Sequence, residues 1–172
     1  MGGDRDDDIY GGNGTDTIFG GTGNDFIMGE NGNDFIYGDD GSDTMYGGSG
    51  NDFIAGGTGN DFIHGESGND DLLGGAGDDT YYHNLTNGGY DVISDLSGVA
   101  DKLIITGTFG DISLERVGNS LRVYDEVDAD DGVLNNLIEI NNFFNGSIIG
   151  AGAIEYLTVG SSTYYLPDLL GL

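Results

Sequence analysis

The chain has 172 residues, including 35 glycines and one proline, and its formal charge at pH 7 is −27. This length fits one domain, or two small ones that share a core. A charge this negative repels nucleic acid and anionic lipid, and there is no run of about 18 apolar residues that could span a membrane. The scarcity of proline excludes collagen, and the absence of cysteine excludes disulfides and thiolate metal sites.

The N-terminus, MGGDRDDDIY, has no basic segment followed by an apolar one, so we expect no cleavable secretory signal. The 31 acidic residues against four basic ones oppose compaction of the chain. Such a charge predicts either a disordered chain or a fold in which cations neutralise the acids. The positions of the acids decide between these two alternatives.

A nine-residue repeat fills the N-terminal half of the chain. Nine consecutive blocks run from Gly2 to Tyr82 without an insertion, as in GGTGNDFIM at 20–28. The first position is glycine in all nine blocks, and the fourth is glycine in eight, with Arg5 as the exception. The sixth position is aspartate in every block: Asp7, Asp16, Asp25, Asp34, Asp43, Asp52, Asp61, Asp70 and Asp79.

Each block predicts a turn followed by a short strand. Closely spaced glycines let the backbone adopt positive φ, whereas the last three positions are rich in β-branched and aromatic residues and favour a three-residue strand. Two blocks, or 18 residues, would complete one coil, and stacked coils would form two parallel sheets. The eighth position would face inward as a thin core, and the aspartates would form two columns, one along each edge.

Columns of carboxylates about 4.8 Å apart require cations. The available donors are carboxylate and carbonyl oxygens, which suit Ca²⁺ better than Mg²⁺ because Mg²⁺ prefers a tight octahedron and retains water. The sequence therefore predicts calcium ligation by the nine aspartates. It also predicts a disordered metal-free chain, because so thin a core does not offset the conformational entropy of the chain.

The blocks resemble the glycine-rich nonapeptide of RTX (repeats-in-toxin, haemolysin-type calcium-binding) proteins, G-G-x-G-x-D-x-U-x. The resemblance covers residues 2–82 and implies an all-β fold, a right-handed parallel β-roll. It also implies that each ion lies between blocks i and i+2, which gives about seven or more Ca²⁺ ions. Arg5 departs from the pattern, and it would either cap the roll or weaken the first site.

Residues 83–105 read as degenerate final turns of the roll. GGYDVISD (88–95) and GVADKLII (98–105) keep a near form of the Gly-x-x-Asp-x-U pattern. Two interpretations stay open for Asp91 and Asp101. They are either further calcium ligands or ordinary turn acids.

Residues 106–172 are predicted to form a β-rich cap, because a stack of open coils needs its edges covered. VGNSLRV (117–123) predicts a hairpin with Gly118 and Asn119 at the turn. The order of segments is similar to the end of adenylate-cyclase-toxin-type secreted proteins. The last residues, STYYLPDLLGL, are either a final element of the cap or the uncleaved signal that a type I secretion apparatus reads in that family.

The outward-facing seventh and ninth positions carry many aromatic side chains. They are expected on both sheets and have two interpretations, cross-strand packing or a surface for polysaccharide or self-association. One face would carry Tyr10, Phe26, Met28, Tyr46, Phe62, His64 and Tyr82, and the other Phe19, Phe35, Tyr37, Phe53 and Leu73.

No catalytic motif accompanies His64 or His83, so we expect no enzyme within this chain. Any catalytic domain of a parent protein would lie outside it. The resemblance implies a secreted, extracellular module, exported by a Gram-negative type I system, that folds on binding calcium and stabilises an upstream domain. The alternative is an adhesion module that binds carbohydrate or a cell surface through its aromatic faces.

Overall fold

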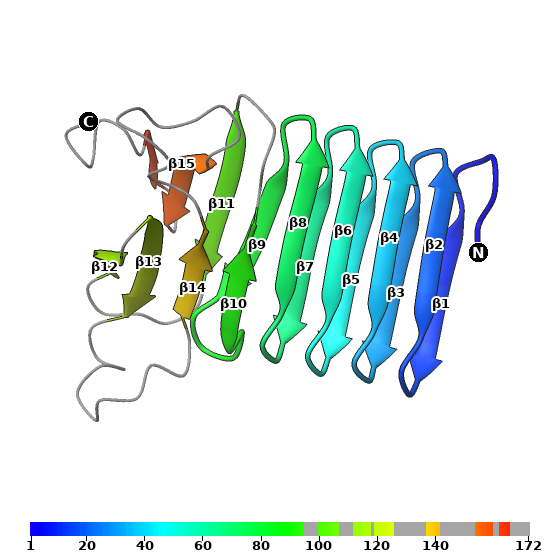
Figure 1. Ribbon diagram of the computed structural model, residues 1–172, viewed down its shortest axis with the longest axis horizontal. Helices are drawn as coiled ribbons and strands as arrows, with labels where there is room; N and C mark the ends of the chain where they lie inside the picture. The colour runs from blue at the N-terminus through cyan, green and yellow to red at the C-terminus, as the bar shows by residue number, and fades with distance from the viewer. Residues whose placement is uncertain are drawn as a thin grey trace.

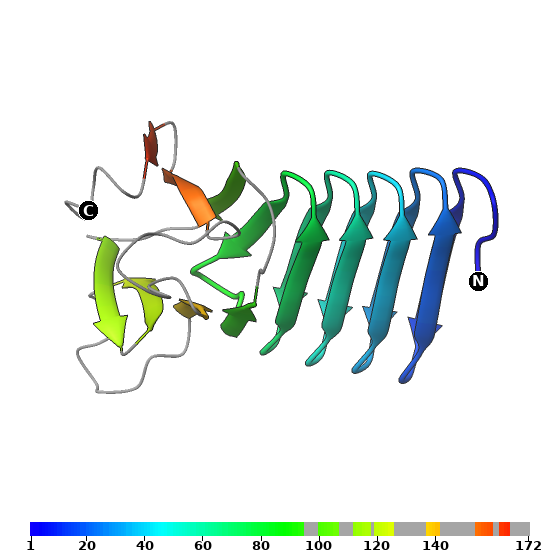
Figure 2. The same cartoon turned by 45° about the horizontal axis from the view of Figure 1, so that its top comes forward.

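A computed structural model of the chain describes residues 1–94, 100–106, 112–117, 119–125, 137–141, 154–159 and 162–165. These residues form two sheets of eight strands each, which lie face to face along the length of the molecule (Figures 1 and 2). The strands are β1 (Asp8–Asn13), β2 (Thr17–Thr22), β3 (Phe26–Asn31), β4 (Phe35–Asp40), β5 (Thr44–Ser49), β6 (Phe53–Thr58), β7 (Phe62–Ser67), β8 (Asp71–Ala76), β9 (Thr80–Asn84), β10 (Tyr90–Ile93), β11 (Asp101–Thr106), β12 (Ile112–Val117), β13 (Ser120–Asp125), β14 (Leu137–Ile140), β15 (Ile154–Val159) and β16 (Ser162–Tyr165).

Strands β1 to β9 each pair in parallel with the strand one full coil later. Ile9 lies opposite Ile27, Ile27 opposite Met45, and Met45 opposite Ile63, so the register advances by 18 residues at each step. The odd-numbered strands β1 to β11 build one sheet, and the even-numbered strands β2 to β10 build the other. This arrangement confirms the predicted 18-residue coil and the all-β parallel roll, whose coils follow one another from β1 to β9 in Figure 1.

The strands are longer than predicted. The sequence predicted three-residue strands, but β3 spans six residues, Phe26–Asn31, and so includes the first three positions of the next block. Those positions stay in the ladder because Glu30 pairs with Gly48 and Asn31 with Ser49. The prediction was wrong because it counted only strong β-formers, whereas glycine without a Cβ also allows close backbone pairing. Only the fourth to sixth positions are left for the turn.

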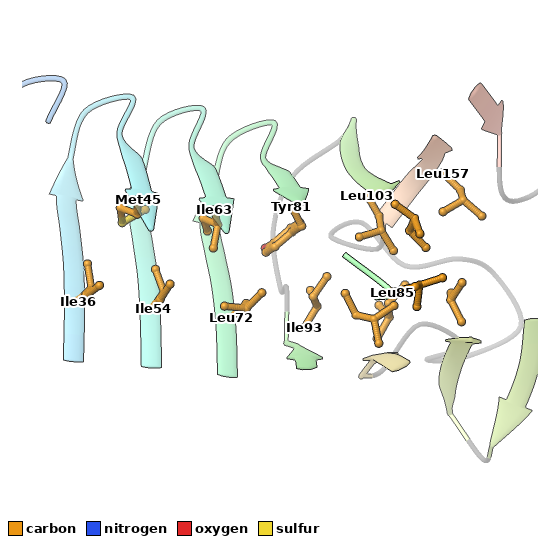
Figure 3. Close-up of a cluster of buried hydrophobic side chains, with 14 of the residues drawn as sticks. Ile36, Met45, Ile54, Ile63, Leu72, Tyr81, Leu85, Ile93, Leu103 and Leu157 are labelled. Carbon is orange, nitrogen blue, oxygen red and sulfur yellow. The ribbon is translucent and has the colours of Figure 1, made fainter. Parts of the chain in front are cut away.

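The core of the roll consists of the side chains at the eighth position of each block, one row from each sheet. Figure 3 shows Met45, Ile63 and Tyr81 on one sheet facing Ile36, Ile54 and Leu72 on the other. From Ile18 to Tyr81 these side chains are buried, with at most 4% of their surface exposed. After Tyr81 the core widens to include Leu85, Ile93, Leu103, Ile105, Leu121, Val123, Ile138, Ile140 and Leu157.

Both sheets continue past the last full repeat. β10 pairs with β14 and β11 with β15, so later strands extend each sheet of the roll at its C-terminal end. β12 and β13 pair antiparallel with Val117 opposite Ser120, which confirms the predicted hairpin. Much of 106–172 lies outside the described residues, including positions 166–172 of the predicted secretion signal. No helix capable of crossing a membrane occurs in the described part of the chain.

Candidate metal centre

The repeat aspartates stand in two hydrogen-bonded columns, each at one edge of the roll. The backbone amide of every aspartate donates to Oδ1 of the aspartate one coil further on. In the middle of the roll Asp34 N lies 2.8 Å from Asp52 Oδ1, and Asp43 N lies 2.8 Å from Asp61 Oδ1. One column contains Asp7, Asp25, Asp43, Asp61, Asp79 and Asp101, and the other contains Asp16, Asp34, Asp52, Asp70 and Asp91.

Asp91 and Asp101 occupy the last places in these columns. Asp70 N donates to Asp91 Oδ1 at 3.1 Å, and Asp79 N donates to Asp101 Oδ1 at 2.8 Å. Their sequence separations from Asp70 and Asp79 are 21 and 22 residues instead of 18. The longer connections therefore preserve the stacking of the carboxylates although the nine-residue register has ended.

The second oxygen of most of these carboxylates is buried and accepts no hydrogen bond from any described residue. From Asp25 onward the column residues are at most 3% exposed, so water does not satisfy this oxygen freely. A buried carboxylate oxygen without a partner is strongly unfavourable. The residues with such an Oδ2 are Asp16, Asp25, Asp34, Asp43, Asp52, Asp61 and Asp70.

The first-position glycines let these oxygens lie directly against the backbone. A Cβ added at Gly47 would overlap Asp52 Oδ2 and lie 2.7 Å from the carbonyl oxygen of Gly65. At Gly38 an added Cβ would likewise overlap Asp43 Oδ2 and lie 2.6 Å from a carbonyl oxygen, that of Gly56. A carboxylate oxygen and a backbone carbonyl oxygen of the next coil thus lie close together beside the glycine, where a Cβ would collide with both of them.

This donor set fits a hard cation. Among the described residues, no three His, Cys, Asp or Glu side chains gather at one point, so backbone carbonyls would have to complete the shell of any ion. Carboxylate and carbonyl oxygens are the usual ligands of Ca²⁺, which accepts six to eight of them in flexible geometry. The residues present are therefore compatible with calcium.

A comparison with protein-family models agrees with this chemistry. The model of the RTX calcium-binding nonapeptide repeat, which spans four copies, matches residues 1–27, 19–54 and 46–81. Residues 1–81 belong to the RTX calcium-binding repeat family. No curated protein matches the chain. RTX repeats are a structural calcium-binding module and not a catalytic one, so calcium is the ligand of this part of the chain.

Burial changes the acid–base behaviour of the RTX aspartates in the absence of metal. It raises the pKa of Asp52 to about 6 and that of Asp61 to about 7, because the charged form loses hydration. The amide donated by the preceding aspartate opposes this rise, and the neighbouring carboxylates of the column add to it. Burial also raises the pKa of Asp43 and Asp70. Ionised columns in this fold therefore require positive charge beside them.

Arg5 does not prevent the first RTX coil from forming. The Gly2 amide donates to the Phe19 carbonyl at 2.9 Å, and the Asp7 amide donates to Asp25 Oδ1 at 2.8 Å. Arg5 itself is exposed, and Asp7 is only partly buried. The first carboxylate is thus in its column, but it is less shielded from water than those further along.

The repeat pattern did not reveal one buried polar residue of the columns, His83. His83 Nδ1 lies 2.6 Å from Asp91 Oδ2, and both side chains are buried. The sequence carried a signal for it, because counting on by nine from Gly74 places His83 at the first position of a tenth block, where the preceding nine blocks have glycine. This signal is weak because the remainder of that block no longer matches the repeat.

Proposed function

We propose that this chain is a calcium-dependent folding module of a larger secreted protein. The observation that carries the proposal is the set of seven buried Oδ2 atoms that lie beside first-position glycines and accept no hydrogen bond from any described residue. The proposed ligands are the repeat aspartates from Asp7 to Asp79 together with Asp101, with backbone carbonyls completing each shell. On this basis the roll holds about seven or more Ca²⁺ ions.

In the folded state the chain's own residues would orient each carboxylate towards its ion. The amide of one aspartate holds Oδ1 of the next, which directs Oδ2 towards the glycine, as with Asp34 and Asp52. When bound, calcium supplies the positive charge that the ionised columns require. Binding and folding are then coupled, because a binding site present only in the folded state makes the binding free energy part of the folding free energy.

Export would exploit this coupling. Extracellular calcium modules bind with Kd values of about 10⁻⁴–10⁻³ M, well above cytosolic calcium concentrations. The chain would therefore stay unfolded inside the cell, pass through a type I secretion apparatus, and fold outside. Membership of the RTX repeat family supports this route. The folded roll would then stabilise an upstream domain of the same protein and would have no catalytic role of its own.

A titration monitored by far-UV circular dichroism tests this function. We expect a steep gain of β signal as Ca²⁺ rises through the millimolar range and no such gain with Mg²⁺ at the same concentrations. Native mass spectrometry of the folded sample should count about seven or more calcium ions. A chain that folds equally well with Mg²⁺, or that binds no calcium when folded, would refute the proposal.

A second candidate function is the binding of polysaccharide or a cell surface through the aromatic faces. Tyr10 and Phe35 are 57% and 45% exposed, and rings follow one another along both sheets. However, the Phe19 and Tyr37 rings stack on each other with centroids 4.9 Å apart, which occupies ring faces that a sugar would use. Glycan-array binding by the calcium-loaded protein, lost in a Phe35→Ser variant that still folds, would favour this second function.

A further inference from the structure

A buried histidine–aspartate pair ends one of the two carboxylate columns. The His83 and Asp91 side chains are 0% and 1% exposed, with Nδ1 and Oδ2 2.6 Å apart. Because the carboxylate accepts, the imidazole donates through Nδ1–H. Seven other aspartates of the columns have an Oδ2 with no partner among the described residues, so Asp91 is an exception.

His83 occupies the place that glycine occupies in the repeats. Tyr82 pairs with His64, so His83 follows Tyr82 as Gly65 follows His64. Asp91 stacks on Asp70, which is the aspartate that Gly65 faces. A Cβ at Gly65 would overlap Asp70 Oδ2. At the next coil this position carries an imidazole, which contacts Oδ2 of the column aspartate Asp91.

A longer turn makes room for the ring. Asp91 follows His83 by eight residues, whereas Asp70 follows Gly65 by five. The added length is ordered: Leu85 enters the core, and the Gly88 amide donates to the Asn84 carbonyl at 2.6 Å. Gly88 packs directly on the ring, since an added Cβ there would lie 2.7 Å from His83 Cε1. The turn is therefore shaped around the imidazole.

We propose that the His83 imidazole replaces a calcium ion at the last turn of this column. This inference rests on the proposed function, because it assigns calcium to the other turns. His83 donates to Oδ2, the oxygen that would bind an ion at the other turns. Asp91 then completes the column through Oδ1 and is a hydrogen-bond partner instead of a calcium ligand. The column is closed by a protein side chain that needs no calcium.

Counting bound calcium by native mass spectrometry tests the replacement in the full chain at saturating Ca²⁺. Asp91→Asn keeps the Oδ1 acceptor, and its amide still hydrogen-bonds to the other tautomer of His83, so the ion count should equal that of the wild type. Asp70→Asn, the matched change one coil earlier, should lose at least one ion. His83→Gly restores the repeat residue and should gain one ion, whereas His64→Gly, on the outer face, should gain none.

The outcomes separate this inference from the proposed function. A wild-type chain that binds no calcium overturns both. A wild-type chain that binds calcium, combined with loss of an ion in Asp91→Asn, overturns the replacement alone. A His83→Gly chain that is folded in calcium with an unchanged ion count also overturns it. If His83→Gly does not fold, the comparison of Asp91→Asn with Asp70→Asn decides.

Discussion

The repeat aspartates from Asp25 to Asp70 use their two carboxylate oxygens differently. Oδ1 accepts an amide from the preceding coil, and in Asp52 this links the turn to Asp34 at 2.8 Å. Oδ2 faces the first-position glycine, Gly47, and has no partner among the described residues. The sequence predicted the columns because the aspartates recur every nine residues. Which oxygen accepts the amide and which lies beside the glycine depends on atomic geometry that a repeat pattern does not contain.

Replacing one buried carboxylate should remove calcium without removing the amide contact. In Asp52→Asn, the retained Oδ1 still accepts from Asp34, but the charge beside the glycine is lost. We expect at least one fewer calcium ion by mass spectrometry and a calcium midpoint for folding at least about threefold higher, equivalent to about 0.7 kcal/mol. The control is Asp71→Asn. Asp71 is exposed and lies one coil further on, where its amide donates to the Asp52 carbonyl, and its substitution should leave the ion count unchanged. Equal ion counts in both variants would contradict the assignment of Asp52.

Three acidic residues occupy second positions where the backbone has positive φ. Glu30, Asp39 and Glu66 have φ values of 73°, 74° and 72°, a conformation that is strained for residues with a Cβ. We expect Glu66→Gly to raise the free energy of unfolding in saturating calcium by about 1 kcal/mol, measured by chemical denaturation. Glu66→Gln removes the same charge but keeps the strain. A glycine variant no more stable than the glutamine variant would show that the backbone is not strained there.

The turns are the elements that set the coil spacing. At the fourth position the backbone of each coil lies directly on the coil before it: a Cβ added at Gly59, whose φ is 122°, would overlap the Gly41 carbonyl oxygen. At Gly14, where φ is 104°, an added Cβ would meet nothing within 4 Å. The two positions therefore share the unfavourable φ and differ only in the stacking contact.

This difference predicts unequal effects of the same substitution. Gly59→Ala should lower the free energy of unfolding in calcium by about 3 kcal/mol, since the clash with a backbone carbonyl adds to the strain of positive φ. Gly14→Ala should lower it by about 1 kcal/mol, from the strain alone. Chemical denaturation of both variants in saturating calcium measures the difference. Equal losses of the free energy of unfolding in the two variants would mean that the clash with the Gly41 carbonyl oxygen adds no cost at the fourth position.

Strands inside the nine-residue repeat could be predicted from the sequence more completely than strands beyond it. The aliphatic eighth positions and the constant register were sufficient to predict two parallel sheets with Ile36, Ile54 and Leu72 inside. The strand length was underestimated because glycines in the ladder, such as Gly48 opposite Glu30, do not look like strand residues. Beyond Tyr82 the hairpin at Val117 and Ser120 was predicted from its turn residues, but the pairing of β10 with β14 joins segments with no shared pattern.

At the scale of the whole molecule, we expect the charge of −27 and the buried columns to make the metal-free roll unstable at neutral pH. In the folded state Asp52 and Asp61 have pKa values of about 6 and 7, compared with an ordinary value of 3.8. Between these values the folded state holds more protons than the unfolded state, so acid favours folding. This stabilisation is fully present below pH 3.8 and is lost as the pH rises through 6 to 7.

Acidification should therefore substitute in part for calcium. In calcium-free buffer we expect the far-UV β signal to increase as the pH is lowered from 8 to 4, with the change centred near the raised pKa values of about 6 and 7. The Asp52→Asn and Asp61→Asn double variant lacks both groups and should show a smaller pH dependence. A metal-free β signal that decreases on acidification over this range would contradict the raised pKa values of Asp52 and Asp61.

Removal of calcium from the loaded protein tests the central claim, that cations beside the buried carboxylates hold the coils together. Small-angle X-ray scattering and far-UV circular dichroism should be recorded at pH 7.5 before and after addition of excess EGTA. We predict loss of the β signal and expansion to a radius of gyration of about 44 Å, the value for an unfolded chain of this length, with full recovery on return of calcium. A chelated chain that keeps its β signal and its compact radius would contradict the account.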